Sequence, residues 1–301
     1  MTVVASAPGK IVLSGEYAVL SGAPAVCMAV TMRACAAVSA SPDGECRVST
    51  PGFTGSDSYA VIDAVCGGER PPSAVELDST AFSVKGTKIG IGSSAAVTVA
   101  LTAALAESTD VFAKALRAHT ALQGGAGSGI DVAVAVHGGL IQYEMDARNV
   151  VRLTWPDGLA MRVLWSGVPA STGAKLEHLA GQAMKPSRAA LTAAAGKIAE
   201  AWRTGNADKV LADYPDYIGA LRQFSVDHDL GIFDAGHDQL TDAAMADNLV
   251  YKPAGAGGGD IGVLLGRDAV DLDRFIAANE TMIHGVVSCD LDPGGVRLES
   301  V

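Results

Sequence analysis

The sequence has few aromatic residues and fewer basic than acidic residues. Only 5% of its 301 residues are aromatic, and 22 Lys and Arg stand against 33 Asp and Glu, which gives a formal net charge of −11. Binding to a nucleic-acid backbone relies on clustered Lys and Arg, so this balance argues against a nucleic-acid partner. A small anionic substrate is still compatible with it, because a few backbone N–H groups and one cation make a locally positive site.

Closely spaced cysteines and long apolar runs are also absent from the sequence. The five cysteines include no C-x-x-C pair, so neither a disulfide framework nor a zinc site is indicated. Gly, Pro or charge interrupts every apolar run before it reaches the length of a membrane span. The opening residues MTVVASAPGK lack the basic and apolar regions of a signal peptide. We therefore expect a cytoplasmic protein with reduced thiols and no membrane partner.

Hydrophobic residues make up 49% of the chain, and their pattern predicts a group of strands followed by helices. Short apolar runs at 11–13, 25–30 and 33–40 are typical of strands. A helix that is apolar on nearly every face is expected over 93–107, and a second one, with its N-cap in 108–110, should run to Leu122.

The second half of the chain has a different hydrophobic pattern, which is typical of amphipathic helices. Residues 175–223 predict two or three amphipathic helices, and the turn at 155–158 precedes them. We place a boundary near residue 160, between domains 1–160 and 161–301. Strands followed by helices, twice over, predict an α+β fold.

Three segments are rich in glycine and other small residues. They are APGKIVLSGEYAV (7–19), GIGSSAA (90–96) and KPAGAGGGD (252–260). A loop of Gly and Ser before a helix presents unpaired N–H groups beside the positive end of the helix dipole, which suits a phosphate. The lysine of the P-loop pattern is missing, and simple N-capping by Ser93 and Ser94 is the structural alternative.

In this order, the three segments resemble the three motifs of the GHMP kinase superfamily (galactokinase, homoserine kinase, mevalonate kinase, phosphomevalonate kinase). The resemblance spans residues 5 to about 266. It implies a two-domain GHMP kinase fold, with an N-terminal ribosomal-protein-S5-like domain that binds ATP, a C-terminal ferredoxin-like α/β sandwich and an active site between them. It also implies ATP and Mg²⁺ as cofactors. The implied ATP-binding residues are Gly90, Gly92, Ser93, Ser94 and Ala95, with Ser94 as a ligand of Mg²⁺.

The segment GSGIDVA (127–133) resembles the part of the family that carries its catalytic aspartate, here Asp131, close to the first-motif lysine, here Lys10. Phosphoryl transfer to a hydroxyl needs a proton acceptor and a cation beside the transferred group, and this pair would supply both. An N-cap role for Asp131 after Gly129 is the structural alternative. The substrate-binding residues that the resemblance implies are Lys10, Ser128, Gly129, Ser171, Gly255, Gly257 and Gly258.

Within the superfamily, the chain looks more like the phosphomevalonate kinase branch than the mevalonate kinase branch. Thr120 occupies the place of a Mg²⁺-binding glutamate of mevalonate kinases, Tyr17 replaces their His, and SGVPAST (166–172) resembles a phosphomevalonate kinase stretch. The implied reaction converts ATP and 5-phosphomevalonate into ADP and 5-diphosphomevalonate.

Several alternatives stay open at this point. The acceptor could instead be mevalonate, a sugar or another alcohol, and a non-catalytic metabolite-binding homologue is a third class. An acceptor phosphate is already largely deprotonated at neutral pH, so Asp131 is either a base or an orienting group. The second protein ligand of Mg²⁺ and the choice between monomer and homodimer are not readable from the sequence.

Other polar residues have competing interpretations. Residues 227–229 (DHD) and 237–238 (HD) are interpreted as surface loop, with a metal site as the alternative. His119 is either a structural histidine or a neighbour of the active site. Asp260 follows the third motif, where loop bracing and an active-site role compete.

Overall fold

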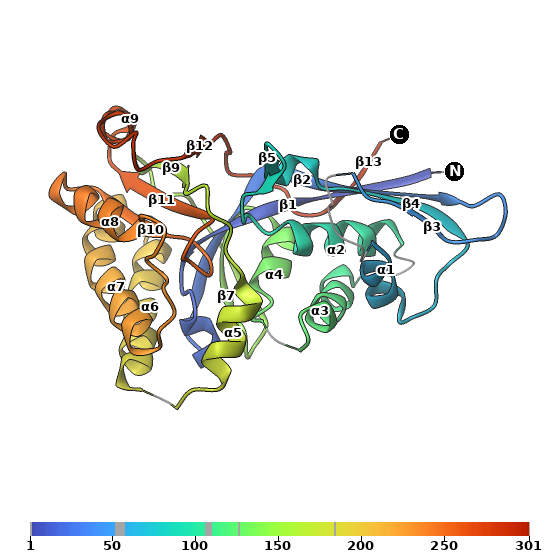
Figure 1. The fold of residues 1–301 in the computed structure, drawn as a ribbon, viewed down its shortest axis with the longest axis horizontal. Coiled ribbons are helices and arrows are strands. Elements are labelled where there is room, and N and C mark those ends of the chain that lie inside the picture. Colours follow the sequence, from blue (N-terminus) through green and yellow to red (C-terminus); the bar gives the residue numbers. More distant parts are fainter. Residues whose placement is uncertain (1, 52–57, 106–109, 126, 184, 301) are drawn as a thin grey trace. The chain divides into compact units, whose positions relative to one another are not determined.

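The computed structural model describes residues 2–51, 58–105, 110–125, 127–183 and 185–300. The chain forms two compact units (Figure 1). The first unit consists of Met1–Ile11, Met28–Gly139 and Asp290–Val301, and the second of Val12–Cys27 and Leu140–Cys289.

The first unit is built on a mixed sheet whose strands follow the order β13-β1-β2-β4-β3 (Figure 1). These strands are β1 (Thr2–Ser14), β2 (Ala25–Ala40), β3 (Arg47–Ser49), β4 (Ser73–Asp78) and β13 (Arg297–Glu299). The pairs β1–β13 and β2–β4 are antiparallel, whereas β3–β4 is parallel. The separate strands predicted at 25–30 and 33–40 are one continuous strand, because residues 31–32 continue the extended backbone.

Four helices accompany this sheet on one side, as Figure 1 shows. They are α1 (Ser58–Cys66), α2 (Ser93–Ala104), α3 (Val111–Leu122) and α4 (Ile130–His137), and the short elements η2 (Thr80–Phe82), β5 (Ser83–Val84) and β6 (Thr87–Lys88) precede α2. Helix α2 is buried from Ala95 to Thr102, which confirms the predicted core helix; its predicted end, Glu107, lies outside the described residues. Helix α3 begins after Asp110, whose side chain accepts a hydrogen bond from Ala113 N, as the N-cap pattern predicts.

The second unit contains a four-stranded antiparallel sheet in the order β10-β11-β9-β12. Its strands are β9 (Ala160–Trp165), β10 (Val250–Pro253), β11 (Ile261–Gly266) and β12 (Gly285–Val287), and helices α8 (His237–Ala246) and α9 (Ala269–Ala278) pack on it. Tyr251, Leu264 and Phe275 belong to the hydrophobic cluster that joins this sheet to the two helices. The hairpin of β7 (Leu140–Glu144) and β8 (Asn149–Leu153) is connected through β7 to β2, and η1 (Ala18–Ser21) lies between β1 and β2 in sequence.

Three further helices of the second unit cover the predicted amphipathic region. They are α5 (Thr172–Ala180), α6 (Pro186–Arg203) and α7 (Ala207–Asp227). Pro186 occupies the first turn of α6, where a missing N–H is harmless. Asn206 caps α7 by accepting a hydrogen bond from Lys209 N at 3.0 Å. The predicted helical content of 175–223 is therefore confirmed.

The α+β class is confirmed, because antiparallel pairing dominates both sheets and no regular βαβ series occurs in the described ranges. The compact units interleave along the chain, so they differ from the single predicted boundary near residue 160. Strands β1 and β2 are long enough to contribute to both units, and residues 290–301 pack with the N-terminal half. The assignment of ATP binding to residues 1–160 stays a prediction.

Arg33 on β2 fastens the C-terminal segment to the first unit. Its guanidinium forms an ion pair with Asp292 at 2.5 Å and donates hydrogen bonds to Ser6 Oγ and to the carbonyl oxygens of Ser6 and Gly295. The Arg33 guanidinium is therefore fully engaged in holding the C-terminal segment in place.

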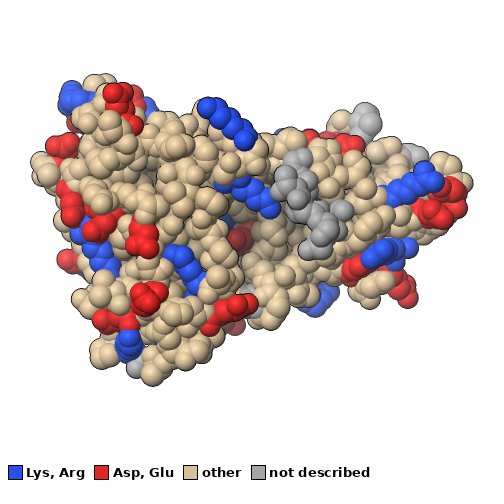
Figure 2. Space-filling model, viewed as in Figure 1, with Lys and Arg blue, Asp and Glu red and all other residues tan. Residues whose placement is uncertain are grey.

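On the face of the molecule shown in Figure 2, the Lys and Arg side chains form no broad basic patch. They lie singly or beside Asp and Glu. Among the described helices, none has both the length and the apolar character that crossing a membrane requires.

Candidate active site

The loop before α2 carries the predicted ATP-binding residues. Gly90 and Gly92 both have positive φ (76° and 84°), and Gly92 is the N-cap of α2. No side chain caps this end of the helix, so the alternative that Ser93 and Ser94 serve as N-caps is wrong. The first N–H groups of an α-helix have no intrahelical partner and lie at the positive end of its dipole. The loop therefore has the local properties of an anion site.

The side chains of this loop differ in accessibility. Ser94 is exposed and Ser93 is half-buried, whereas Ala95 is the first of the fully buried residues of α2. The buried helix fixes the loop to the core, and the Ser94 hydroxyl faces solvent, where a ligand can reach it.

Lys10 on β1 lies directly beside this loop. Its backbone N donates a hydrogen bond to Ile91 O at 2.8 Å, which ties the first motif to the second. A Cβ added to Gly92 would lie 2.8 Å from Lys10 Cγ. Glycine is thus required at position 92 for two reasons: its positive φ and the passage of the Lys10 side chain.

We expect Gly92→Ala to misplace Lys10. Because the resemblance implies a catalytic role for Lys10, kcat should fall by roughly 10- to 100-fold, the size of effect that small displacements of catalytic groups have. The positive φ alone should cost about 1–2 kcal/mol of stability. Gly86→Ala is the matched control, because Gly86 has φ of 79° but no atom within 4 Å of an added Cβ. Steady-state kinetics and thermal unfolding of both variants separate the two effects. A Gly92→Ala enzyme as active as Gly86→Ala would contradict the expected role of the contact.

Lys10 and Asp131 form an ion pair, with 3.7 Å between Lys10 Nζ and Asp131 Oδ1. Their side chains are 11% and 30% exposed, respectively, so the pair is reachable from solvent. Asp131 lies in the first turn of α4, and the N-cap is Gly129 with φ of 79°. The alternative that Asp131 is the N-cap is therefore wrong. Ser128, just before this cap, is half-buried.

His119 in the last turn of α3 is buried and lies near this ion pair. Burial lowers the pKa of His119 below its ordinary value, the Asp131 carboxylate acts in the opposite direction, and the Lys10 ammonium adds to the lowering. Burial therefore favours the neutral form of this imidazole, which senses the charges of both Asp131 and Lys10. No partner in the described structure is within hydrogen-bond reach of its Nε2.

The remaining predicted residues lie in the second unit. Gly255, Gly257 and Gly258 have positive φ (79°, 67° and 74°). Gly258 N donates a hydrogen bond to Ile232 O at 2.7 Å, and a Cβ at Gly257 would collide with Ile232. Ser171 is exposed and caps α5, because its Oγ accepts a hydrogen bond from Ala174 N at 3.4 Å. The run of small residues thus has a packing reason as well as a predicted binding role.

A buried charged network in the second unit was not predicted from the sequence. Lys252 of the third motif is paired with Glu16 of the first motif, and their side chains are 0% and 2% exposed. Tyr217 on α7 donates a hydrogen bond to Glu16 Oε2 at 2.5 Å and accepts one from Gly15 N at 2.8 Å. Burial raises the pKa of Tyr217 well above its ordinary value, and Glu16 adds to this, so the phenol stays a donor. In the sequence, this network is visible only as an acidic residue in the first motif, Glu16, and a basic residue in the third motif, Lys252.

Tyr17 strengthens the same connection. Its hydroxyl donates a hydrogen bond to Ala256 O at 2.7 Å. The first motif therefore contacts the third motif through Glu16 and Tyr17, whereas its Lys10 contacts the second motif in the first unit.

The residues considered for a metal site do not form one. No cluster of three or more His, Cys, Asp or Glu suited to a metal ion occurs in the described part of the chain. His228 and His237 are fully buried, which makes the surface-loop interpretation wrong for both. His237 forms hydrogen bonds with Tyr251 Oη at 2.8 Å and with Gly259 O at 3.0 Å, so it braces the third motif.

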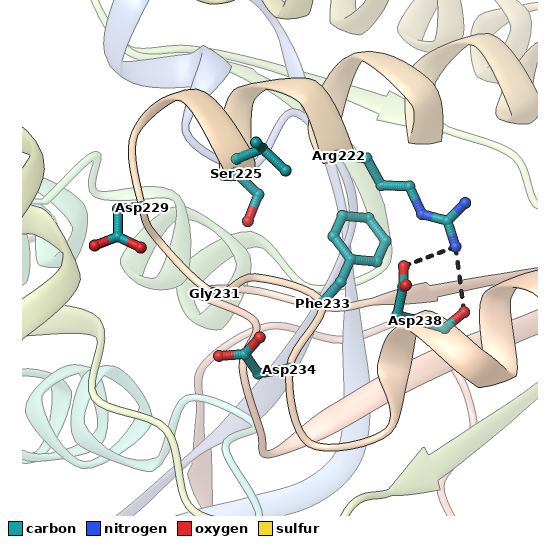
Figure 3. Close-up of a pocket in the computed structure, with 8 residues that line it drawn as sticks. Arg222, Ser225, Asp229, Gly231, Phe233, Asp234 and Asp238 are labelled. Atoms are coloured by element: carbon teal, nitrogen blue, oxygen red, sulfur yellow. Dashed lines mark hydrogen bonds and ion pairs between the residues drawn. The ribbon is translucent and has the colours of Figure 1, made fainter.

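A pocket of about 420 Å³ lies beside the loop that follows α7 (Figure 3). Arg222 spans one side of it and forms an ion pair with Asp238 at 2.9 Å. The pocket is lined by Arg222, Ser225, Val226, Asp229, Gly231, Phe233, Asp234 and Asp238. None of the residues predicted to bind ATP, Mg²⁺ or the acceptor is among them.

Comparison with known proteins agrees with this picture. Residues 66–139 match the family of GHMP kinases N terminal domain, a range that includes the second motif and Asp131. The chain is 28% identical to a phosphomevalonate kinase of Streptomyces sp. (strain CL190), over 88% of this chain and 90% of that protein. It is 25% identical to a mevalonate kinase of Bos taurus, over 88% and 86%.

Similarity of fold extends over nearly the whole chain. The structure of a Streptococcus pneumoniae phosphomevalonate kinase, in complex with phosphomevalonate and AMPPNP, superposes with a TM-score of 0.81 at 20% identity, covering 97% of this chain and 100% of that one. The chain is therefore similar to GHMP kinases: residues 66–139 match their N-terminal domain, and a phosphomevalonate kinase and a mevalonate kinase resemble it over most of its length.

Proposed function

We propose that the protein is an ATP-dependent kinase that converts 5-phosphomevalonate into 5-diphosphomevalonate. The observation that carries the proposal is the position of Lys10, whose side chain lies against Gly92 of the glycine-rich loop and pairs with Asp131. One cation thereby borders both a phosphate-binding loop and an acidic group, which is the arrangement that phosphoryl transfer needs. The similarity to phosphomevalonate kinases over most of the chain supports the choice of acceptor.

In the proposed reaction, an oxygen of the acceptor phosphate attacks the γ-phosphorus of ATP, and the bond to the β,γ-bridging oxygen breaks to release ADP. Lys10 would stabilise the charge on the transferred group, and Asp131 would hold Lys10 in place. The backbone N–H groups at Gly90 to Ala95 would bind the ATP phosphates at the start of α2. Ser128, Gly129, Ser171 and the third-motif glycines at 255, 257 and 258 stay proposals for substrate binding.

The residues at the loop fit a magnesium ion. Ser94 presents an exposed hydroxyl that caps no helix, and Mg²⁺ prefers oxygen ligands, with substrate phosphates among them. Ser94 would hold the ion together with ATP, and the ion would neutralise charge on the phosphates. The cytoplasm is the proposed compartment, where the five cysteines would stay the free thiols that the structure shows.

An ADP-release assay with Mg-ATP and a panel of acceptors tests the proposal. We expect turnover with 5-phosphomevalonate at roughly 1–100 s⁻¹, the usual range for kinases, and far less with mevalonate or common sugars. Turnover with mevalonate alone would replace the proposed acceptor by an alcohol. ATP binding without turnover on any acceptor would overturn the enzymatic function and leave a metabolite-binding homologue.

Mevalonate kinase is the second candidate, since a bovine mevalonate kinase also matches most of the chain. Thr120 and Tyr17, at places where mevalonate kinases are expected to carry Glu and His, argue for the phosphorylated acceptor. Tyr17 is buried and bonded to Ala256 O, so it has a defined structural role here.

A further inference from the structure

Asp260, which ends the third motif, has an unusual backbone conformation. Its φ is 53°, in the left-handed region that non-glycine residues rarely occupy. Asp tolerates this region better than most residues because its short side chain can form local hydrogen bonds. The conformation turns the chain from the glycine run into β11.

Three hydrogen bonds join Asp260 to one segment, residues 166–170. Its backbone N donates to Val168 O at 2.6 Å, its carbonyl O accepts from Ser166 N at 2.9 Å, and its Oδ1 accepts from Ala170 N at 3.1 Å. The preceding Gly259 lies so close to this segment that an added Cβ would be 2.5 Å from Val168 O. One residue therefore sets the path of the segment.

The fastened segment leads directly into the exposed start of α5. Ser171, one residue after Ala170, is the N-cap of that helix. One turn further along, Lys175 Nζ donates hydrogen bonds to Leu230 O at 2.6 Å and Gly231 O at 3.2 Å, and it lies against Gly258. The N-terminal turn of α5 is thus attached to the third motif through Asp260, and Lys175 attaches it to the loop at 230–231, which lies beside Gly258.

We propose that Asp260 is a positioning residue for the acceptor: it holds Ser171 and the first turn of α5 in fixed register with the glycines of the third motif. The proposal rests on the proposed function, in which both elements bind the acceptor. Because the Asp260 side chain holds Ala170, its loss frees the cap of α5 while the backbone bonds to Ser166 and Val168 persist. Acceptor affinity should fall, whereas ATP affinity and the chemical step should not.

The test compares Asp260→Gly with Asp260→Asn. Asp260→Gly permits the same positive φ and keeps both backbone hydrogen bonds, but it removes Oδ1. We expect its KM for the acceptor to rise about tenfold, equivalent to about 1.4 kcal/mol, with KM for ATP and kcat each within about threefold of the wild type. Asp260→Asn keeps an acceptor oxygen at the same place and should restore the KM.

Asp229→Gly is the matched control. Asp229 also has a positive φ (48°), is exposed and belongs to the same unit, and no hydrogen bond connects it with residues 166–170 in the described structure. We expect unchanged kinetics for this variant. Thermal unfolding of all variants reports whether each one folds.

The outcomes separate this proposal from the proposed function. An active wild type whose Asp260→Gly variant has an unchanged acceptor KM, or equal increases in both KM values, would overturn the positioning role alone. If the wild type turns over mevalonate instead, the proposed acceptor is wrong, but Asp260→Gly should still raise the KM for mevalonate and leave the KM for ATP unchanged. Absence of turnover by the wild type on every acceptor would overturn the proposed function and this inference with it.

Discussion

Replacement of Lys10 by Met is expected to lower kcat by about 10²- to 10³-fold with Mg-ATP and 5-phosphomevalonate, the usual effect of removing one preorganised electrostatic stabiliser. Lys10 is held in place by its backbone hydrogen bond to Ile91 and by the contact of its side chain with Gly92. The variant keeps the aliphatic stem, so the loss would report on the charge.

Asp131→Asn is expected to have a smaller effect, about tenfold in kcat, because positioning alone contributes less than general base catalysis. An acceptor phosphate is largely deprotonated at neutral pH, since its second pKa is near 6, so no proton must be removed. With an alcohol acceptor, loss of a base would cost about 10²- to 10⁴-fold, and Asp131→Asn would be at least as damaging as Lys10→Met. The order of the two variants therefore identifies the chemistry of the acceptor.

Both variants should fold normally, because a partly exposed ion pair contributes about 1 kcal/mol or less to stability. Asp208→Asn is a matched control for Asp131→Asn, since Asp208 also lies in the first turn of a helix, α7, but outside the proposed machinery. Lys209→Met on the same helix is the control for Lys10→Met. Retention of full kcat by Lys10→Met would contradict the role of Lys10 on which the proposed function rests.

The sequence predicted the local elements around the site well, because local patterns determine them. The apolar run after Ser93 predicted a buried helix, and the N-cap of the next helix was expected within 108–110, where Asp110 is found. The caps of α2 and α4 were less predictable. Gly, Ser and Asp all favour N-caps, and only the positive φ of Gly92 and Gly129 in the folded chain decides between neighbours.

Long-range features could not be predicted from one sequence. Nothing local indicates that β1 and β2 contribute to two units, because the division depends on which residues pack against each strand. Glu16 and Lys252 are separated by 236 positions. Each alone is typical of a solvated surface, and the pairing that makes burial tolerable is a property of the tertiary structure.

Replacement of Lys252 by Met is expected to destabilise the second unit by about 3–5 kcal/mol, because it leaves the Glu16 carboxylate buried without its cation. The pair is almost fully buried, so water cannot replace the lost partner. Tyr217→Phe should cost less, about 1.5–3 kcal/mol, the value of a hydrogen bond to a charged group. The double variant Glu16→Gln/Lys252→Met removes both charges and should be less destabilised than the sum of the single variants.

Tryptophan fluorescence during urea unfolding measures these effects in the right place, since Trp155, Trp165 and Trp202, the three tryptophans of the chain, all belong to the second unit. Lys197→Met is the control, because Lys197 is 52% exposed and pairs with Asp213 and Asp216 on the surface of that unit; its change should stay below about 1 kcal/mol. A Lys252→Met midpoint as high as that of Lys197→Met would contradict a buried, paired charge. The expected result is a large loss of unfolding free energy in Lys252→Met that the double variant partly recovers. The double variant has no unpaired charge in the core, so this result would show that the connection between the first and third motifs depends on charge pairing.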